Sequence, residues 1–264
     1  MRRPPAALLV NTPDIELWPA ALLRARANRD ARVLARASWV LRRKRDGRYL
    51  AALLPEGLMP LLPDWRRTPG LDAALDLLDT SPAALPSTPA DTLPIARLQA
   101  RLDSLGIEAQ TYTARTGLSL VPEPTWLAFA GVDRYRRPLW LQAEAAQGWT
   151  RMREAARGDG IALEAISGYR SHDYQLGIFE RKRARGLDVD AILEVNAAPG
   201  YSEHHSGSAL DIGTPGEPSA EPSFEATPAF AWLTRHASDH GFAMSYPRGN
   251  PHGIVYEPWH WRHR

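Results

Sequence analysis

Cysteine is absent from the 264-residue chain. This absence excludes disulfides and thiolate-bound zinc, so a metal bound here must take its ligands from His, Asp or Glu. Lysine is nearly absent as well, because only Lys44 and Lys182 occur and arginine carries almost all of the positive charge. The formal net charge is only +2, so we expect no basic surface of the size that nucleic acid requires.

Long apolar runs are also missing. No segment approaches the roughly 18 consecutive apolar residues that a membrane-spanning helix needs. Residues 1–5 are charged and residues 6–10 are apolar, which resembles a signal peptide, but the apolar run is short and residues 11–16 turn polar at once. We therefore expect neither a membrane span nor an export signal.

The histidines are confined to one part of the chain. All eight lie between His172 and His263, so a site that uses histidine must lie in the C-terminal part. A segment near residues 81–94 is rich in proline and has the composition of a linker. We divide the chain into an N-terminal accessory region, residues 1–112, and a second domain, residues 113–264.

Apolar periodicity and turn residues predict the secondary structure. Residues 38–53 predict a hairpin that turns at Asp46-Gly47. The segments that predict helices are 71–78, 95–105, 145–156, 173–185 and 230–237. The segments that predict strands are 161–166, 209–212, 243–246 and 254–256, with a loop at 214–228. Helices and strands do not alternate regularly, which favours an α+β domain over a doubly wound sheet.

His204 and Asp211 lie seven residues apart in the segment 202–211. Gly207 permits a turn between them, and Asp211 falls in the strand expected at 209–212. An imidazole and a carboxylate brought together in this way are suitable zinc ligands. The pair alone is a weak signal.

Glu257 and His260 lie three residues apart, next to Trp259 and Trp261. Exposed tryptophans are costly, so this segment is expected to be packed and rigid. A catalytic zinc needs three protein ligands and one open position, and a nearby carboxylate can take a proton from the attacking water. His260 would complete the ligand set, and Glu257 would remain free as the base.

Arg170 follows the strand expected at 161–166, and Gln175 lies five residues later. Arginine binds carboxylates through two parallel hydrogen bonds, which suits a peptidase that recognises a free C-terminus. The same side chain could stabilise a developing oxyanion. Pairing of Arg170 with a structural acid is the alternative.

Two motifs in the second domain resemble the signature of the LAS metallopeptidases, a group that includes lysostaphin, D-alanyl-D-alanine carboxypeptidase and sonic hedgehog. They are Ser202-x-His204-x-x-Gly207-x-Ala209-x-Asp211 and Glu257-x-x-His260. The segments 167–171, 245–247, 252–254 and 257–262 resemble the VanY-like D-alanyl-D-alanine carboxypeptidase branch. The resemblance covers residues 113–264, whereas the first 112 residues resemble no family that we can name.

The resemblance implies a small antiparallel sheet with flanking helices and one zinc ion per chain. The implied zinc ligands are His204, Asp211 and His260. Glu257 is implied as the base, and the residues implied to contact the substrate are Arg170, Gln175, Ser202 and Tyr246. His205 is not a ligand by the motif spacing and is expected near the site or at the surface. Trp126, Trp140, Trp149 and Trp232 are expected in the core.

The resemblance further implies hydrolysis of the C-terminal D-alanine bond of peptidoglycan peptides or muropeptides. Three alternatives stay open: an L,D-carboxypeptidase, an endopeptidase that cuts cross-links, and a non-catalytic zinc-binding module. This substrate class suggests the periplasm or cell envelope, whereas the missing export signal suggests the cytoplasm. The N-terminal region is expected to be either a lid or a separate binding module, and the oligomeric state stays open.

Overall fold

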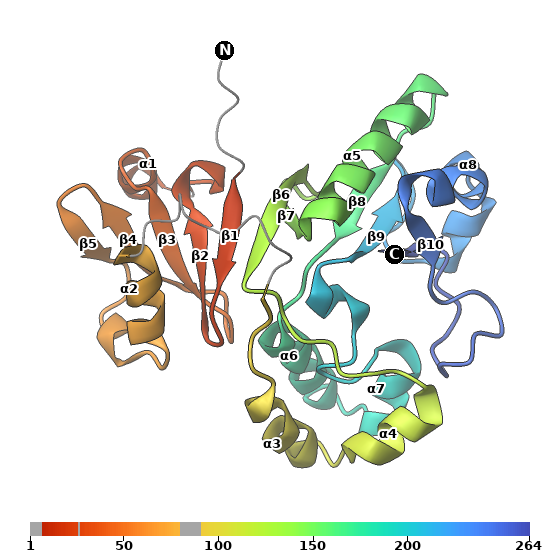
Figure 1. Cartoon of the computed structure of the whole chain (residues 1–264), viewed down its shortest axis with the longest axis horizontal. Helices are drawn as coiled ribbons and strands as arrows, with labels where there is room; N and C mark the ends of the chain where they lie inside the picture. The colour runs from red at the N-terminus through yellow and green to blue at the C-terminus, as the bar shows by residue number, and fades with distance from the viewer. Residues whose placement is uncertain (1–6, 26, 80–90) are drawn as a thin grey trace. The chain divides into compact units, whose positions relative to one another are not determined.

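A computed structural model of the chain describes residues 7–25, 27–79 and 91–264. The chain divides into two compact units (Figure 1). The first contains the residues up to Leu93 together with Pro124–Phe129, and the second contains Pro94–Glu123 and Ala130–Arg264. Most of the linker predicted near residues 81–94 lies outside the described residues.

The first unit is built on an antiparallel sheet with the strand order β5-β4-β3-β2-β1-β6. Strand β7 (Pro138–Leu141) belongs to the second unit. The strands of the first unit are β1 (Leu8–Asn11), β2 (Ile15–Pro19), β3 (Trp39–Arg43), β4 (Tyr49–Leu54), β5 (Gly57–Pro60) and the beginning of β6 (Trp126–Val132). The helical segments are α1 (Asn28–Leu34), α2 (Leu71–Asp79) and the 3-10 turns η1 (Ala20–Leu22) and η2 (Trp65–Arg67).

The hairpin predicted at residues 38–53 is confirmed as β3 and β4. Its turn contains Gly47 at φ +68°, a left-handed conformation that favours glycine. The apolar residues near the N-terminus form β1, in which Leu9 and Val10 are buried. The helix predicted at 71–78 is confirmed as α2, which packs Leu71 and Ala74 into the core of this unit.

The second unit carries a four-stranded antiparallel sheet, with the order β10-β11-β9-β8. The strands are β8 (Glu164–Ser167), β9 (Ala209–Gly213), β10 (Phe242–Met244) and β11 (His260–His263). All five residues of β9 are buried, so this strand lies in the centre of the domain. A small antiparallel sheet combined with helices confirms the predicted α+β class.

Helices flank this sheet (Figure 1). The α-helices of the second unit are α3 (Ala96–Ser104), α4 (Ala109–Thr116), α5 (Ala143–Gly158), α6 (His172–Arg183), α7 (Val189–Val195) and α8 (Pro228–His236). The 3-10 helices are η4 (Glu203–Ser206), η5 (Pro222–Ala226) and η6 (Ala237–His240). Helix α5 contacts β7 and β11 and buries Trp149 and Met152. Helices α3, α4, α6 and α7 share a second apolar cluster that includes Leu102, Tyr112 and Phe179.

The boundary between the two units differs from the division drawn at residues 112 and 113. That division falls within α4, and α3 belongs to the second unit. Leu98 and Leu102 on α3 are buried in the same cluster as Phe179 on α6. Proline-rich composition marks a connection in the sequence, but shared burial of apolar side chains decides which unit a helix joins.

One predicted strand is wrong. Residues 254–256 form no strand, and the Val255 N–H donates to the Glu194 carbonyl oxygen instead of to a neighbouring strand. The strand that forms in this region is β11 (His260–His263), which pairs with β9 on one side and β10 on the other. Branched and aromatic residues favour extended backbone, but a strand also needs a pairing partner, which composition does not supply. The strands predicted at 161–166 and 243–246 are confirmed with shifted ends.

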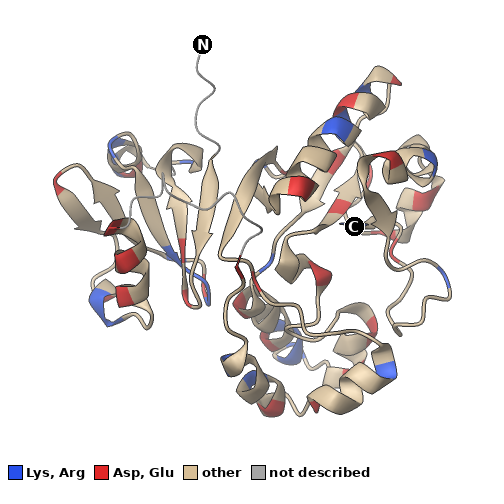
Figure 2. Cartoon of the chain, in the orientation of Figure 1, with Lys and Arg blue, Asp and Glu red and all other residues tan. Residues whose placement is uncertain are grey.

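The described helices offer no candidate for a transmembrane segment, because each of them is too short or too polar. Figure 2 shows acidic and basic segments interspersed along the elements of both units. This distribution agrees with the formal net charge of +2.

Candidate metal centre and active site

Strand pairing in the second unit places Asp211 opposite His260. The two residues are Cα partners in the antiparallel pairing of β9 with β11. Directly opposite residues of antiparallel strands have neighbouring side chains on one face of the sheet. As a result, His260 Nδ1 lies 3.1 Å from Asp211 Oδ1, although 49 positions separate the residues.

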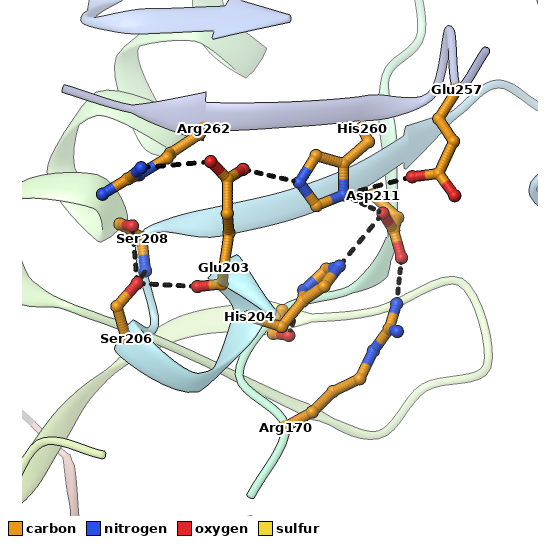
Figure 3. Close-up of polar contacts among 10 residues, drawn as sticks. Arg170, Glu203, His204, Ser206, Ser208, Asp211, Glu257, His260 and Arg262 are labelled. Atoms are coloured by element: carbon orange, nitrogen blue, oxygen red, sulfur yellow. Dashed lines mark hydrogen bonds and ion pairs between the residues drawn. The ribbon is translucent and has the colours of Figure 1, made fainter. Parts of the chain in front are cut away.

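His204 reaches the same carboxylate oxygen from the 3-10 helix η4. This helix ends at Gly207, whose φ of 75° lets the chain turn directly into β9. His204 Nε2 lies 3.2 Å from Asp211 Oδ1 (Figure 3). One ligand atom from each of His204, Asp211 and His260 lies within 4.8 Å of the other two, and all three residues are buried. Two imidazole nitrogens and a carboxylate oxygen that converge in this way fit a zinc ion.

The second ring nitrogen of each histidine is also engaged. His204 Nδ1 lies 2.7 Å from the Gly168 carbonyl oxygen, and His260 Nε2 lies 2.9 Å from Glu203 Oε2. Such contacts hold the imidazoles of metal sites in one orientation. A Cβ atom at residue 168 would lie 2.9 Å from the Trp140 carbonyl oxygen, so glycine is what allows this close approach.

The buried charges at this centre interact strongly. Burial, followed by the positive charge of Arg170, lowers the pKa of His204 to about 4. Burial alone would lower the pKa of His260 as well, but hydrogen bonds to Asp211 and Glu203 raise it to about 10. Burial would raise the pKa of Asp211, yet the nearby His204 and Arg170 hold it well below its usual value. The carboxylate of Asp211 is therefore ionised and available to a cation.

Glu257 lies beside this group of ligand atoms. Its Oε2 lies 3.8 Å from His260 Nδ1. Burial raises the pKa of Glu257 to about 7, even though the adjacent His260 opposes the shift. A carboxylate with a pKa near the working pH can both accept and return a proton.

Arg170 forms an ion pair with Asp211. Its Nη2 donates to Asp211 Oδ2, and its Nε donates to Ser167 Oγ at 2.9 Å. The sequence left open that Arg170 pairs with an acidic residue instead of a substrate. Such a pair is present, and the acid is Asp211, the predicted metal ligand. Asp211 uses one oxygen toward the two histidines and the other toward Arg170 (Figure 3).

A cavity of about 610 Å³ opens over these residues. The predicted site residues that line it are Arg170, Gln175, Ser202, His204, Asp211, Tyr246, Glu257 and His260. Gln175 Nε2 donates to the Ala197 carbonyl oxygen at 2.9 Å, whereas its buried Oε1 has no partner. The Tyr246 ring lies 4.8 Å from the His260 ring, and burial raises the pKa of its hydroxyl. The structure thus brings every predicted site residue to one cavity.

His205 lies next to His204 but does not belong to the ligand group. It is fully buried, its Nδ1 lies 2.7 Å from the Arg170 carbonyl oxygen, and its Nε2 accepts from the Gly200 N–H at 3.1 Å. Both ring nitrogens are therefore occupied by the backbone. Trp140, Trp149 and Trp232 are buried as expected, whereas Trp126 is only partly buried.

Two acidic residues that sequence reasoning missed contact the site. Glu203 binds His260, and its position immediately before His204 was the available signal. Glu123 accepts from the Tyr169 hydroxyl at 2.6 Å and from the His172 N–H at 2.7 Å, and thereby holds the loop that carries Arg170. No sequence pattern points to Glu123, because its partners lie more than 40 positions away.

Comparisons with known proteins show which family the chain resembles. The family model described as VanY, D-alanyl-D-alanine carboxypeptidase, matches residues 138–264. A Bacillus subtilis (strain 168) protein named YodJ is 37% identical over 133 residues, which cover 47% of this chain and 46% of YodJ. The bifunctional D-Ala-D-Ala dipeptidase and D-Ala-D-Ala carboxypeptidase VanXYC of Enterococcus gallinarum is 30% identical over 149 residues, which cover 53% of this chain and 75% of that protein.

Among solved structures, the LdcB LD-carboxypeptidase has 35% sequence identity and a TM-score of 0.44. The similarity covers 47% of this chain and 59% of that one. The chain spans about half the length of YodJ. The residues that the family model matches, 138–264, lie in the second unit, which carries the cavity. With three quarters of the VanXYC protein matched, the chain belongs to the VanY family of D-alanyl-D-alanine carboxypeptidases.

Proposed function

We propose that the chain is a zinc-dependent carboxypeptidase that hydrolyses the C-terminal D-alanine peptide bond of peptidoglycan-derived peptides. The observation that carries this proposal is the convergence of the ligand atoms of His204, Asp211 and His260 beside Glu257 on the wall of one cavity. The second unit holds all of these residues, so we assign the catalytic role to it.

We assign the metal to His204 Nε2, Asp211 Oδ1 and His260 Nδ1. These atoms face one another, and the remaining nitrogen of each histidine is engaged elsewhere. Three protein ligands are the usual number for a catalytic zinc, which keeps a further position for water or substrate. When bound, zinc supplies Lewis acidity that brings the pKa of a water molecule toward neutrality and polarises a carbonyl group.

We assign Glu257 as the general base. Its carboxylate takes a proton from water while the water oxygen bonds to the scissile carbonyl carbon. The same proton then passes to the leaving amine nitrogen as the carbon–nitrogen bond breaks. Because burial raises the pKa of Glu257 to about 7, accepting and returning the proton are closely balanced near neutral pH. A buried base beside the ligands argues against a non-catalytic zinc-binding module.

We assign Arg170 to the terminal carboxylate of the substrate. The hydrogen bonds to Ser167 and Asp211 fix the plane of its guanidinium group, and arginine carries five N–H donors in all. Its side chain keeps 21% exposure at the cavity wall, so the remaining N–H groups can meet a ligand. Stabilisation of the developing oxyanion is a second role that this location permits.

Gln175, Ser202 and Tyr246 complete the proposed substrate contacts. The buried Gln175 Oε1 without a partner is an acceptor that a peptide N–H of the substrate would satisfy. The raised pKa of Tyr246 keeps its hydroxyl protonated and able to donate. The family description and the name of the VanXYC relative support D-Ala-D-Ala peptides as the substrate class.

The direct test is incubation of the zinc-loaded protein with defined muropeptides that end in D-Ala-D-Ala, followed by mass analysis of the products. We expect loss of one terminal alanine, which a chelator abolishes and added zinc restores. Cleavage of only tetrapeptides with an L,D terminal bond, or of only cross-linked dimers, would identify one of the other peptidase specificities. Zinc binding without any cleavage would contradict the proposal.

A further inference from the structure

We propose that Glu203 is a positioning residue that holds the outer nitrogen of His260, Nε2, and thereby directs Nδ1 toward the metal. The inference rests on the proposed function, because it requires a metal bound by His204, Asp211 and His260. Neither the two sequence motifs nor the comparisons give Glu203 a role.

The Glu203 carboxylate is bound on both of its oxygens. Oε2 lies 2.9 Å from His260 Nε2, and Oε1 accepts from Arg262 Nη1 at 3.0 Å (Figure 3). Only 12% of the Glu203 side chain is exposed. The ion pair with Arg262 in a largely buried setting fixes the orientation of the acceptor that His260 meets.

The backbone explains why these groups meet. His260 and Arg262 are two residues apart on β11, so their side chains leave the same face of the strand. Glu203 begins the 3-10 helix η4, immediately before His204. Consecutive residues of a 3-10 helix are rotated by about 120°. Glu203 can therefore reach the outer edge of the His260 ring while His204 faces Asp211.

This contact selects one tautomer of His260. A neutral imidazole carries one N–H, and only the nitrogen without it can bind a metal. An N–H donated from Nε2 to Glu203 leaves the lone pair on Nδ1, which lies 3.1 Å from Asp211 Oδ1. The Gly168 carbonyl oxygen has the corresponding role at His204, through the opposite nitrogen. A carboxylate partner also makes the ligating nitrogen more basic than a carbonyl partner does.

Two other roles fit the geometry less well. A fourth metal ligand would have to lie on the Nδ1 side of the His260 ring, but Glu203 meets the ring at Nε2. Glu203 could instead serve only as an ion-pair partner of Arg262. In that case its replacement would leave the metal affinity unchanged, an outcome that the following measurement detects.

The test is the zinc affinity of Glu203→Gln, measured by competition with a chromophoric chelator. The substitution keeps the size of the side chain but removes the charge that His260 and Arg262 share. We expect zinc to bind 10–100-fold more weakly, which is the usual effect of losing such a partner of a ligating histidine. Glu221→Gln is the matched control, because Glu221 lines the same cavity and is exposed.

Nitrogen-15 NMR of histidine in the zinc-loaded protein gives a second readout. We expect the signal of His260 Nε2 to shift in Glu203→Gln, because the carboxylate that accepts this N–H is lost, whereas a Glu203 that only pairs with Arg262 would leave the signal unchanged. Where Glu203→Gln fails to fold, Arg262→Gln replaces it, since Arg262 holds the other carboxylate oxygen and its side chain is 48% exposed. A smaller loss of zinc affinity in that variant supports the inference.

Zinc affinity of the folded Glu203→Gln protein within twofold of the wild type would overturn the inference, as would an equal loss in Glu221→Gln. Failure of the proposed function has a different signature. Wild-type protein that binds zinc tightly but cleaves no muropeptide contradicts the peptidase assignment, whereas the affinity difference between the two glutamate variants still decides the role of Glu203.

Discussion

Asp211 and His260 face each other across the antiparallel pairing of β9 and β11. This register brings His260 Nδ1 to within 3.1 Å of Asp211 Oδ1, and His204 reaches the same oxygen from η4. A shift of the register by one residue would move the His260 side chain to the opposite face of the sheet. The geometry of the proposed metal centre thus depends on the strand pairing as much as on the residues themselves.

Replacement of Glu257 by glutamine should separate metal binding from turnover. The variant lacks the proposed base but keeps every proposed ligand, so we expect zinc content equal to that of the wild type and a kcat lower by about 10²–10⁴-fold. Steady-state kinetics on a muropeptide and metal analysis of the same preparation test this. Glu180→Gln, at an exposed residue of α6 outside the cavity lining, should retain wild-type kcat, and retained turnover in Glu257→Gln would remove the assigned base.

Replacement of Arg170 by lysine should weaken recognition of the substrate carboxylate. Lysine cannot reproduce the two parallel hydrogen bonds of a guanidinium group. We therefore expect the substitution to cost about 2 kcal/mol of transition-state stabilisation, which lowers kcat/KM roughly 30-fold. A peptide with an amidated C-terminus should be a poor substrate for both proteins. If the variant loses the same factor on both peptides, Arg170 does not bind the carboxylate. Because Arg170 also contacts Asp211, zinc content must be measured alongside.

Zinc binding should release a proton from His260. Its pKa is raised to about 10, above the ordinary value of 6.5, so the metal-free protein carries a proton on both ring nitrogens at about pH 8. Binding at Nδ1 requires loss of one of them, and we expect release of about one proton per zinc ion. Calorimetry in buffers of different ionisation enthalpy measures this number. Zinc uptake without proton release at that pH would contradict the assignment of Nδ1.

Replacement of Leu102 by alanine should destabilise the second unit. Leu102 on α3 is fully buried in the cluster that also contains Phe179, so we expect the free energy of unfolding to fall by about 2–5 kcal/mol. Chemical denaturation followed by circular dichroism measures the change. Leu187→Ala, at a residue that is 40% exposed, is the control and should cost much less. A negligible effect of Leu102→Ala would contradict the placement of α3 in the second unit.

The candidate site was predictable because its residues lie in two short motifs. His204, Gly207 and Asp211 form one, and Glu257 with His260 forms the other. Within such segments the local turn and strand geometry decides where side chains point, and residue type decides which chemistry they allow. The hairpin at residues 38–53 and helix α2 were predictable for the same reason, since turn residues and apolar periodicity act over short distances.

Other features depended on contacts between distant segments. Residues 254–256 have the composition of a strand, but the strand formed at His260–His263, where β9 and β10 supply partners on both sides. Helix α3 lies close to the proline-rich segment in sequence, yet it is buried with α6. Glu123 holds the loop that carries Arg170 by accepting a hydrogen bond from Tyr169, which lies 46 positions later in the sequence. Pairing, burial and long-range hydrogen bonds leave no periodic trace in the sequence.

The sequence by itself determined the chemistry that is available: no thiolates, and two histidines, an aspartate and a glutamate in family motifs. Only the tertiary structure decided which atoms of these side chains face one another. In the folded chain, Nε2 of His204 and Nδ1 of His260 both lie close to Oδ1 of Asp211, and Arg170 donates to Oδ2. The physical reason is that residue identity defines what a side chain can bind, whereas its direction follows from strand register and from the hydrogen bonds of its neighbours.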